Sequence, residues 1–323
     1  MEDSSFDLEL ELSSLPREKW WGDHYLFQHG GFWLMPESIQ GVNRVAKHFR
    51  PLPSDVILAS YPKTGTTWLK ALLYSIVNRS YKHRLTVENP HSLVPFLEFF
   101  DIYGTPPYES TTVVDPLSDI NHSRRIFSTH MPYQLLAKTL NSSDCHVVYV
   151  TRNPKDTLVS SWHFVNKWDE AREEPWPFEV AVEKFCRGVT PYGPYYDHVM
   201  GYRNLGLERP KNAHFVTYEE LKNDPQTNVK NLAEFLGCPF EGEDVEGQVR
   251  EIVKSCSFEV LSSHEVNKSE DVLAGVPLPL TVNSFFRKGG VGGYKDHMSD
   301  EIVGKIDALT REKFHSLGFM YGI

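Results

Sequence analysis

Short apolar runs of the kind found in buried strands alternate with helical segments along most of this chain. The run at residues 55–60, DVILAS, precedes a helical segment at residues 68–80. Similar units follow at residues 124–132, 145–164 and 213–237. Strands that alternate with helices predict an α/β fold, with a central parallel sheet flanked by helices on both faces. In such a sheet, ligands bind beyond the carboxyl ends of the strands.

The composition marks no boundary between two domains. The chain has 323 residues, which is enough for one large α/β domain. We expect a single domain over residues 17–323, preceded by a loose acidic tail at residues 1–16. Residues 36–49 place apolar side chains at helical spacing and predict a further helix. Residues 80–123 and 262–296 are richer in Pro, Gly and Ser, so we expect long loops there that cover the site.

The charge balance excludes a general basic surface for nucleic acid or acidic membranes. There are 33 basic and 43 acidic residues, for a net charge of −10, so an anionic ligand needs a local cluster of donors. No apolar run approaches the roughly 20 residues that span a bilayer, and the N-terminus does not resemble a signal peptide. The four cysteines form no CxxC pair, which favours reduced thiols. We expect a soluble cytoplasmic protein.

The segment YPKTGTTW lies between the first apolar run and the helix that follows it. Backbone N–H groups in such a turn and at a helix N-terminus form a site for an anion. Gly65 permits close approach of the backbone, while Thr66 and Thr67 add hydroxyl donors. Lys63 adds a positive charge, but it precedes the glycine, whereas the lysine of a Walker loop follows the last glycine. The alternative interpretation is an ordinary turn with a surface lysine.

Two further segments carry cations and flexible backbone. Arg152 ends a predicted strand, where it is well placed to bind a phosphate through two hydrogen bonds, and Ser160 follows in the next helix. The segment FFRKGGVGGYKD places Arg287 and Lys288 before four glycines, so its backbone is able to surround an anion. The alternatives are a surface ion pair between Arg152 and Asp156, and a flexible surface loop.

His130 follows a predicted strand in the segment STHMP. An unperturbed histidine titrates near neutral pH, which suits it to remove a proton from a hydroxyl nucleophile. The chain has 14 histidines, so a structural role is the alternative. The metal pattern HExxH and the hydrolase pattern GxSxG are both missing, and we expect no metal.

Together these segments resemble the cytosolic sulfotransferase family, and their flanks are most similar to its plant branch. Members transfer a sulfuryl group from 3′-phosphoadenylyl sulfate (PAPS) to a hydroxyl or amine and release 3′,5′-ADP (PAP). YPKTGTTW is similar to the family's 5′-phosphosulfate loop, with Thr64 where serine is more usual. TRNPKDTLVSSWHF and FFRKGGVGGYKD resemble its 3′-phosphate elements, and STHMP resembles the segment that bears its catalytic histidine.

The resemblance implies a role for each matched residue. His130 would be the base, and Lys63 would stabilise the oxygen that leaves with the nucleotide. The 5′-phosphosulfate would be bound by Lys63, Thr64, Gly65, Thr66 and Thr67, the 3′-phosphate by Arg152, Ser160, Arg287, Lys288 and Gly289, and the adenine by Trp68, Tyr218 and Phe258.

The acceptor is left open by these motifs. Aromatic residues in segments that are candidates for its walls are Phe32, Trp33, Tyr133, Phe164, Tyr192, Tyr195 and Tyr196, although each is equally suited to the core. Such a pocket suits a small, largely apolar hydroxyl acceptor. A flavonoid or other phenol is favoured, and hydroxy-jasmonates, steroids and desulfoglucosinolates are alternatives.

The sequence also leaves two alternative functions open. One is a kinase that transfers phosphate from ATP with magnesium, and the other is a non-catalytic nucleotide-binding protein of the same fold. The family's dimer element, KxxxTVxxxE, does not match KDHMSDEIVG in this chain, so we expect a monomer.

Overall fold

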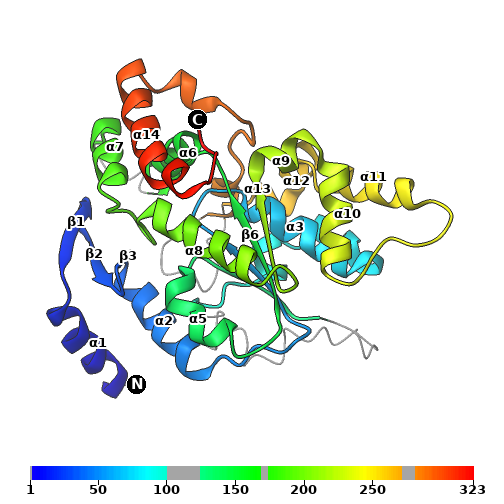
Figure 1. The fold of residues 1–323 in the computed structure, drawn as a ribbon, viewed down its shortest axis with the longest axis horizontal. Coiled ribbons are helices and arrows are strands. Elements are labelled where there is room, and N and C mark those ends of the chain that lie inside the picture. Colours follow the sequence, from blue (N-terminus) through cyan, green and yellow to red (C-terminus); the bar gives the residue numbers. More distant parts are fainter. Residues whose placement is uncertain (1, 100–123, 169–173, 271–280) are drawn as a thin grey trace.

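The computed structural model describes residues 2–99, 124–168, 174–270 and 281–323, and its central element is a parallel sheet (Figure 1). The order of its strands is β5-β4-β6-β7, and all three pairings are parallel. This confirms the predicted fold class. The strand bounds are Val56–Ser60 for β4, Ile126–Thr129 for β5, His146–Thr151 for β6 and Ala213–Thr217 for β7.

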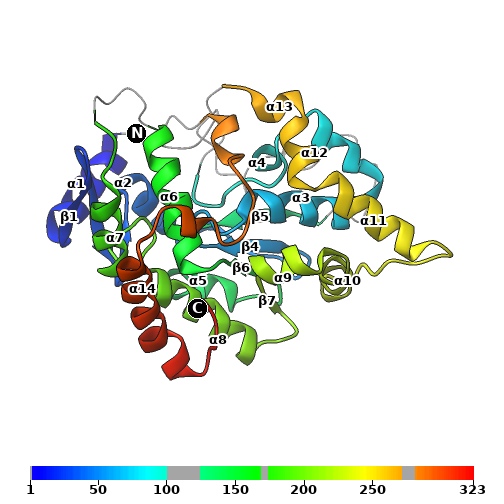
Figure 2. The same ribbon diagram turned by 90° about the horizontal axis from the view of Figure 1, so that it is seen from above.

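Helices cover both faces of this sheet because successive strand residues point in opposite directions. In β4, Val56 and Leu58 pack against one set of helices and Ile57 and Ala59 against the other, and all four are fully buried. Figures 1 and 2 show the sheet between these two layers. The first layer contains α3 (Thr66–Val77), α10 (Pro225–Phe235) and α11 (Val245–Ser255), and the second contains α2 (Pro36–His48), α5 (Tyr133–Leu140), α8 (Tyr195–Glu208) and α14 (Asp300–Lys313).

The register of the strands brings the polar segments after them to one edge of the sheet. Ala59 pairs with Thr129, so the loop after β4 and His130 after β5 leave the sheet at the same level. Ser60 pairs with Val150, which places the end of β6 beside the start of the same loop. The polar groups that follow strands β4, β5 and β6 in the sequence therefore lie close together at this edge of the sheet.

The N-terminal segment differs from our prediction of a loose tail. Residues 2–14 form helix α1 (Glu2–Ser14), and Leu8 and Leu12, one turn apart, pack against the core. The carboxylate of Glu11 accepts a hydrogen bond of 2.8 Å from the side chain of Asn43 in α2. The prediction was wrong because it weighed the acidic composition above the spacing of the leucines.

Residues 17–34, to which we assigned no element, form a second sheet. Its antiparallel strands are β1 (Arg17–Trp21), β2 (His24–His29) and β3 (Phe32–Leu34), in the order β1-β2-β3. Trp33 of β3 forms a bridge with Gly193, which attaches this sheet to the chain just before α8. The small sheet thus belongs to the same domain as the parallel sheet.

The two segments predicted as long loops contain short helices where the structure describes them. Residues 100–123 and 271–280, which belong to these segments, lie outside the described residues.

The other helices of the described chain, inside and outside these two segments, are α4 (Pro90–Leu93), α6 (Pro154–Trp168), α7 (Phe178–Cys186), α9 (Tyr218–Asn223), α12 (Phe258–Ser263), α13 (Glu265–Lys268), and the 3₁₀ helices η1 (Arg79–Thr86), η3 (Val282–Phe285), η4 (Gly293–Asp296) and η5 (His315–Leu317).

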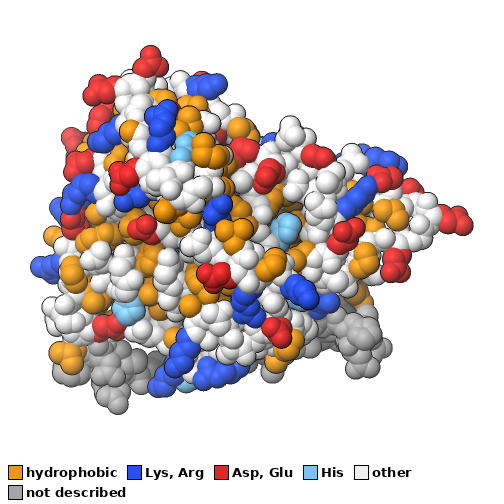
Figure 3. Space-filling view, viewed as in Figure 1, with side chains coloured by type: hydrophobic (Ala, Val, Ile, Leu, Met, Phe, Trp, Pro, Cys, Tyr) orange, Lys and Arg blue, Asp and Glu red, His pale blue; other side chains and the backbone are white. Residues whose placement is uncertain are grey.

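Acidic and basic side chains are interspersed over most of the face shown in Figure 3. This distribution agrees with the absence of a general basic surface that the net charge of −10 predicts. No helix among the described residues combines the length and apolar character needed to cross a bilayer.

Candidate active site

A cavity of about 420 Å³ is lined by residues from the carboxyl edge of the parallel sheet and from the helices that follow it. It collects nearly all of the site residues that the resemblance implied. The predicted donor-binding and catalytic residues that line it are Lys63, Gly65, Thr66, Thr67, Trp68, His130, Arg152, Ser160, Tyr218, Phe258, Arg287, Lys288 and Gly289.

Thr64 is the exception among the predicted donor-binding residues. It is fully buried, and its hydroxyl donates to the carbonyl oxygens of Tyr61 at 2.7 Å and Val150 at 3.0 Å. It does not belong to the residues that line the cavity. Its side chain therefore ties the loop to strands β4 and β6, and a hydroxyl that already donates there is not available to a ligand.

The turn before α3 needs glycine at residue 65. Gly65 has a φ of +115°, and a Cβ atom at this position would lie 2.7 Å from the ring of Tyr218. Any larger residue would be strained and would also push this ring. The helix begins at Thr66, so the N–H groups of its first turn have no partner within the helix. Such a terminus favours an anion.

The ammonium of Lys63 is half-buried beside aromatic rings and other cations. Its Nζ atom lies 3.7 Å from the centroid of Phe164, a distance at which the ring face attracts a cation. Burial, followed by the charges of Arg287 and Arg152, lowers the pKa of Lys63 to about 7. A bound anion would raise this pKa again, because it stabilises the charged form.

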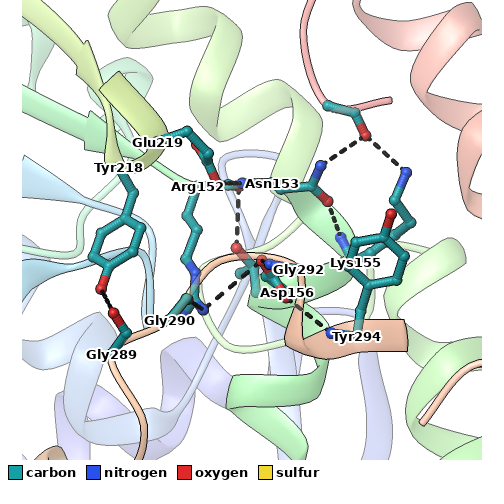
Figure 4. A network of polar contacts seen from close by, with 12 residues as sticks. Arg152, Asn153, Lys155, Asp156, Tyr218, Glu219, Gly289, Gly290, Gly292 and Tyr294 are labelled. Atoms are coloured by element: carbon teal, nitrogen blue, oxygen red, sulfur yellow. Dashed lines mark hydrogen bonds and ion pairs between the residues drawn. The ribbon is translucent and has the colours of Figure 1, made fainter. Parts of the chain in front are cut away.

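Arg152 connects the two segments that the resemblance assigned to the 3′-phosphate (Figure 4). Its Nη2 atom donates to the carbonyl oxygen of Gly290 at 2.7 Å, and the guanidinium lies 4.8 Å from the ring centroid of Tyr218. Its Nε atom is buried and has no hydrogen-bond partner among the described residues. A buried N–H donor of this kind is suited to an anionic ligand.

Asp156 holds the glycine-rich loop against helix α6. Its carboxylate accepts hydrogen bonds from the backbone N–H groups of Gly292 at 2.7 Å and Tyr294 at 3.0 Å, as Figure 4 shows. Asp156 is only 2% exposed and lies 3.9 Å from Arg152. The sequence suggested a surface ion pair between these two residues, but both are buried and the carboxylate mainly binds the loop.

Gly289 and Tyr218 complete this part of the site. The hydroxyl of Tyr218 donates to the carbonyl oxygen of Gly289 at 2.7 Å, and the ring of Trp68 lies 5.4 Å from that of Tyr218. A Cβ atom on Gly289 would lie 2.7 Å from the ring of Phe258. These contacts bring Trp68, Tyr218 and Phe258, the three residues expected at the adenine, to the same cavity.

The C-terminal residues support the turn that carries Arg152. The carbonyl oxygen of Gly322 accepts from the side chains of Asn153 at 3.2 Å and Lys155 at 3.0 Å. The backbone N–H of Asn153 donates to Glu219 at 3.0 Å (Figure 4). Sequence reasoning missed this support because the partners lie more than 60 residues from the turn.

His130 is held in one orientation and one tautomer. Its Nδ1 atom lies 2.8 Å from the carbonyl oxygen of Ser60, and a carbonyl oxygen only accepts, so Nδ1 carries the proton. Its backbone N–H donates to Glu98 at 2.7 Å, and its carbonyl oxygen accepts from His198 at 2.9 Å. Burial lowers the pKa of His130 to about 3, despite the hydrogen bond to Ser60. The imidazole is therefore neutral at pH 7, with a lone pair on Nε2.

Of the five acceptor-wall candidates Phe32, Trp33, Tyr133, Phe164 and Tyr195, only Phe164 lines the cavity. Phe32, Trp33 and Tyr195 are buried in the core, and the hydroxyl of Tyr195 donates to the carbonyl oxygen of Arg152 at 2.6 Å. Tyr133 packs on α8 through Tyr202. These predictions were wrong because an aromatic residue in a core and one in a pocket have the same sequence pattern.

The walls that the structure does provide are also aromatic. Tyr192, from the wider list of candidates, lines the cavity, while Tyr196 does not. Phe96 lies 4.7 Å from the ring of His130, so a flat acceptor beside this ring would have the base within reach. The aromatic residues that line the cavity also include Trp20, Phe99, Trp176, Phe185 and Phe285. The run PFLEFF, which contains Phe96 and Phe99, was a sequence signal for these two wall residues.

The donor set of the cavity suits a nucleotide with several negative charges. Lys63, Arg152, Arg287 and Lys288 all line it, and Glu259 is the one carboxylate among its described lining residues. Across the described ranges, no group of three or more His, Cys, Asp or Glu residues is arranged to hold a metal ion.

Comparison with known proteins identifies the family. Residues 53–318 match the family model described as the sulfotransferase domain. The chain belongs to the sulfotransferase family. It is 40% identical to cytosolic sulfotransferase 12 of Arabidopsis thaliana over 99% of this chain and 95% of that protein, which confirms the resemblance to the plant branch. This sulfotransferase is thus an enzyme of a family whose donor is PAPS.

Solved structures of sulfotransferases share its fold. An Arabidopsis thaliana protein described as a putative steroid sulphotransferase is 35% identical, with a TM-score of 0.73 over 99% of this chain and 97% of that chain. A mouse sulfotransferase complexed with PAP is 26% identical, with a TM-score of 0.65 over 89% of this chain and 93% of that chain. The single-domain α/β prediction is confirmed.

Proposed function

We propose that this enzyme transfers a sulfuryl group from PAPS to the hydroxyl of a small, largely apolar acceptor, with His130 as the base and Lys63 as the group that stabilises the leaving oxygen. The observation that carries the proposal is a single cavity lined by several cations, a neutral histidine of fixed tautomer and aromatic side chains. PAPS supplies the sulfuryl group when it is bound. The chain supplies orientation, charge and a proton acceptor.

His130 acts on the acceptor hydroxyl. Because the carbonyl oxygen of Ser60 keeps the proton on Nδ1, Nε2 is free to take the proton of the acceptor hydroxyl. The hydroxyl oxygen forms its bond to sulfur at the same time. The contact of the His130 backbone with Glu98 fixes the strand end that carries the ring. Fixed positions of this kind account for much of the rate gain when two reactants must meet in line.

Lys63 acts on the opposite side of the transferred group. The bond from sulfur to the nucleotide breaks as the new bond forms, and negative charge grows on the oxygen that leaves. An ammonium at the entrance of the loop is suited to stabilise this charge. This role explains the unusual order of the loop, in which the lysine comes before the glycine, near the bond that breaks.

The acceptor is best described as a flat phenol such as a flavonoid. Phe96, Phe164 and Tyr192 line the cavity, and aromatic side chains bind planar rings through stacked or edge contacts. Steroids remain an alternative, supported by the description of the 35% identical Arabidopsis protein. Hydroxy-jasmonates and desulfoglucosinolates are further classes of hydroxyl acceptor.

The proposal is tested by incubating the purified protein with ³⁵S-labelled PAPS and a panel of phenols, sterols and aliphatic alcohols, in buffer with EDTA. We expect labelled product with at least one phenol, and loss of that product in His130→Ala. Complete loss of transfer on chelation would contradict the proposal and support a metal-dependent kinase. Binding of PAP without transfer to any acceptor would support a non-catalytic protein.

A further inference from the structure

Behind the phosphate loop, His91 and Lys70 form a chain of hydrogen bonds with Thr67, and the proposed reaction assigns no role to His91 or Lys70. The Nε2 atom of His91 lies 3.0 Å from the hydroxyl of Thr67, and its Nδ1 atom lies 3.1 Å from the Nζ atom of Lys70. Lys70 is fully buried and His91 is 5% exposed, whereas Thr67 is half-buried and lines the cavity. These hydrogen bonds thus connect a fully buried lysine to a threonine that lines the cavity.

The ring of His91 is fixed in this position. Its backbone N–H donates to the side chain of Asn89, the N-cap of α4, at 2.8 Å. Its ring centroid lies 4.1 Å from that of Phe285 and 5.7 Å from that of Phe96. Since packing and the cap hold the ring, its two nitrogen atoms keep separate partners.

The direction of each bond follows from what each group is able to donate. In its charged form Lys70 has three donors and no lone pair, so it then donates to Nδ1 of His91. Burial, and then the charge of Lys70, keep the pKa of His91 well below its usual value, so the ring is neutral and has one proton. That proton must be on Nε2, which donates to Thr67. The hydrogen of the Thr67 hydroxyl is then left to point at another acceptor.

Phe96 and Glu98 favour the charged form of Lys70, while burial opposes it. Its Nζ atom lies 3.6 Å from the ring centroid of Phe96, an arrangement that attracts a cation. Burial lowers the pKa of Lys70, and the charge of Glu98 opposes this. An anion in the adjacent donor site would act in the same direction as Glu98, because it also favours nearby positive charge.

We propose that Lys70 and His91 are positioning residues that orient the Thr67 hydroxyl as a donor to the anionic end of the sulfuryl donor, which rests on the function proposed above. A neutral Lys70 would allow the chain to reverse. His91 would then donate from Nδ1 to Lys70, and Thr67 would donate to His91, with no hydrogen left for the anion. A charged Lys70 thus requires the tautomer of His91 that carries its proton on Nε2.

Nitrogen-15 NMR of the histidine rings, with the complete protein in the presence and absence of PAP, tests this tautomer without any assay of activity. The signals of His91 are assigned by their loss in His91→Asn. We expect the PAP complex to have its His91 proton on Nε2, opposite to His130, whose proton is on Nδ1. A His91 proton on Nδ1 in the PAP complex would overturn the inference. Failure of PAP to bind would instead overturn the proposed function.

A double-mutant cycle tests whether Lys70 acts through Thr67. Lys70→Met and Thr67→Val should each lower kcat/KM for PAPS by about tenfold, the effect of one hydrogen bond to a charged group. The double variant should resemble Thr67→Val alone, because the same hydroxyl carries both effects. Independent losses that multiply to about a hundredfold would overturn the inference, since a general structural defect gives this result.

Two further variants serve as a substitute for Lys70→Met and as a control. If Lys70→Met does not fold, His91→Asn takes its place in the cycle with the same expectation. Ser75→Ala is the matched control, since Ser75 is a fully buried polar residue of the same helix whose hydroxyl lies 3.3 Å from the sulfur of Cys256. It should leave kcat/KM for PAPS unchanged.

Discussion

The two parts of the cavity that we propose to bind the phosphates of PAPS are built in different ways. The 5′ part is one contiguous loop between β4 and α3, shaped by Gly65 and tied down by the hydroxyl of Thr64. The 3′ part joins two segments that are more than 130 residues apart in the sequence, and Asp156 and Arg152 hold them together through the backbone of residues 290–294. The first is local in the chain, while the second exists only after folding.

This difference suggests a division of labour. The contiguous loop contains Lys63, for which we propose a role at the bond that breaks, and a short loop after a strand holds such a group with little freedom. The assembled part binds a phosphate that does not react, so its residues should contribute mainly to affinity. Variants in the first part should therefore lower kcat, and variants in the second should weaken nucleotide binding.

The largest effect is expected from Lys63→Met. Loss of one donor at a developing negative charge costs roughly 10²–10³ in rate, so kcat should fall by this factor. The affinity for PAP, which has no sulfuryl group, should change by less than about tenfold because the remaining donors persist. Steady-state kinetics and calorimetry measure the two quantities, and a kcat close to that of the wild type would remove Lys63 from the mechanism.

Asp156→Asn should loosen the assembled part. One amide oxygen cannot replace a carboxylate that accepts from both Gly292 and Tyr294, and an unpaired buried N–H costs about 1–3 kcal/mol. We expect PAP affinity to fall by about tenfold and the free energy of unfolding to fall by about 2 kcal/mol, while kcat at saturating PAPS changes little. A loss confined to kcat would contradict the division between the two parts.

The pH dependence of PAP binding should report on Lys63. Its pKa is about 7 in the free protein, and a bound anion raises it, so binding takes up a proton above pH 7. Affinity should therefore fall as the pH rises through this range, by at most about tenfold per unit. Calorimetry in two buffers of different ionisation enthalpy measures the uptake. In Lys63→Met the slope should flatten, and an unchanged slope would assign the proton to another group.

The smallest effect is expected from Thr64→Ser. Serine keeps the hydroxyl that donates to Tyr61 and Val150 and removes one buried methyl group, worth about 0.8 kcal/mol. The kinetic constants should stay within about fourfold of the wild-type values, the factor that corresponds to about 0.8 kcal/mol. Thermal unfolding should show the small loss of stability, and a large rise of KM for PAPS would mean that the side chain contacts the donor.

The contrast between local and assembled features also explains what the sequence could predict. The parallel sheet, the loop around Gly65 and the strand-end position of His130 follow from short stretches of residues. The grouping of Arg152 with residues 287–289 came from a family resemblance, and no local pattern indicates that Asp156 binds Gly292. The acceptor walls were mostly predicted wrongly, because Tyr195 and Phe96 differ in their neighbours in space and not in their neighbours in sequence.

The central claim is that the two parts bind one nucleotide, and titration calorimetry with PAP, 5′-AMP and magnesium-ATP tests it most directly. The account predicts that 5′-AMP, which lacks the 3′-phosphate, binds at least about a hundredfold more weakly than PAP, since it loses two or more charged hydrogen bonds. In Arg287→Met this difference should shrink. Equal affinities for PAP and 5′-AMP, or tighter binding of magnesium-ATP than of PAP, would contradict the account.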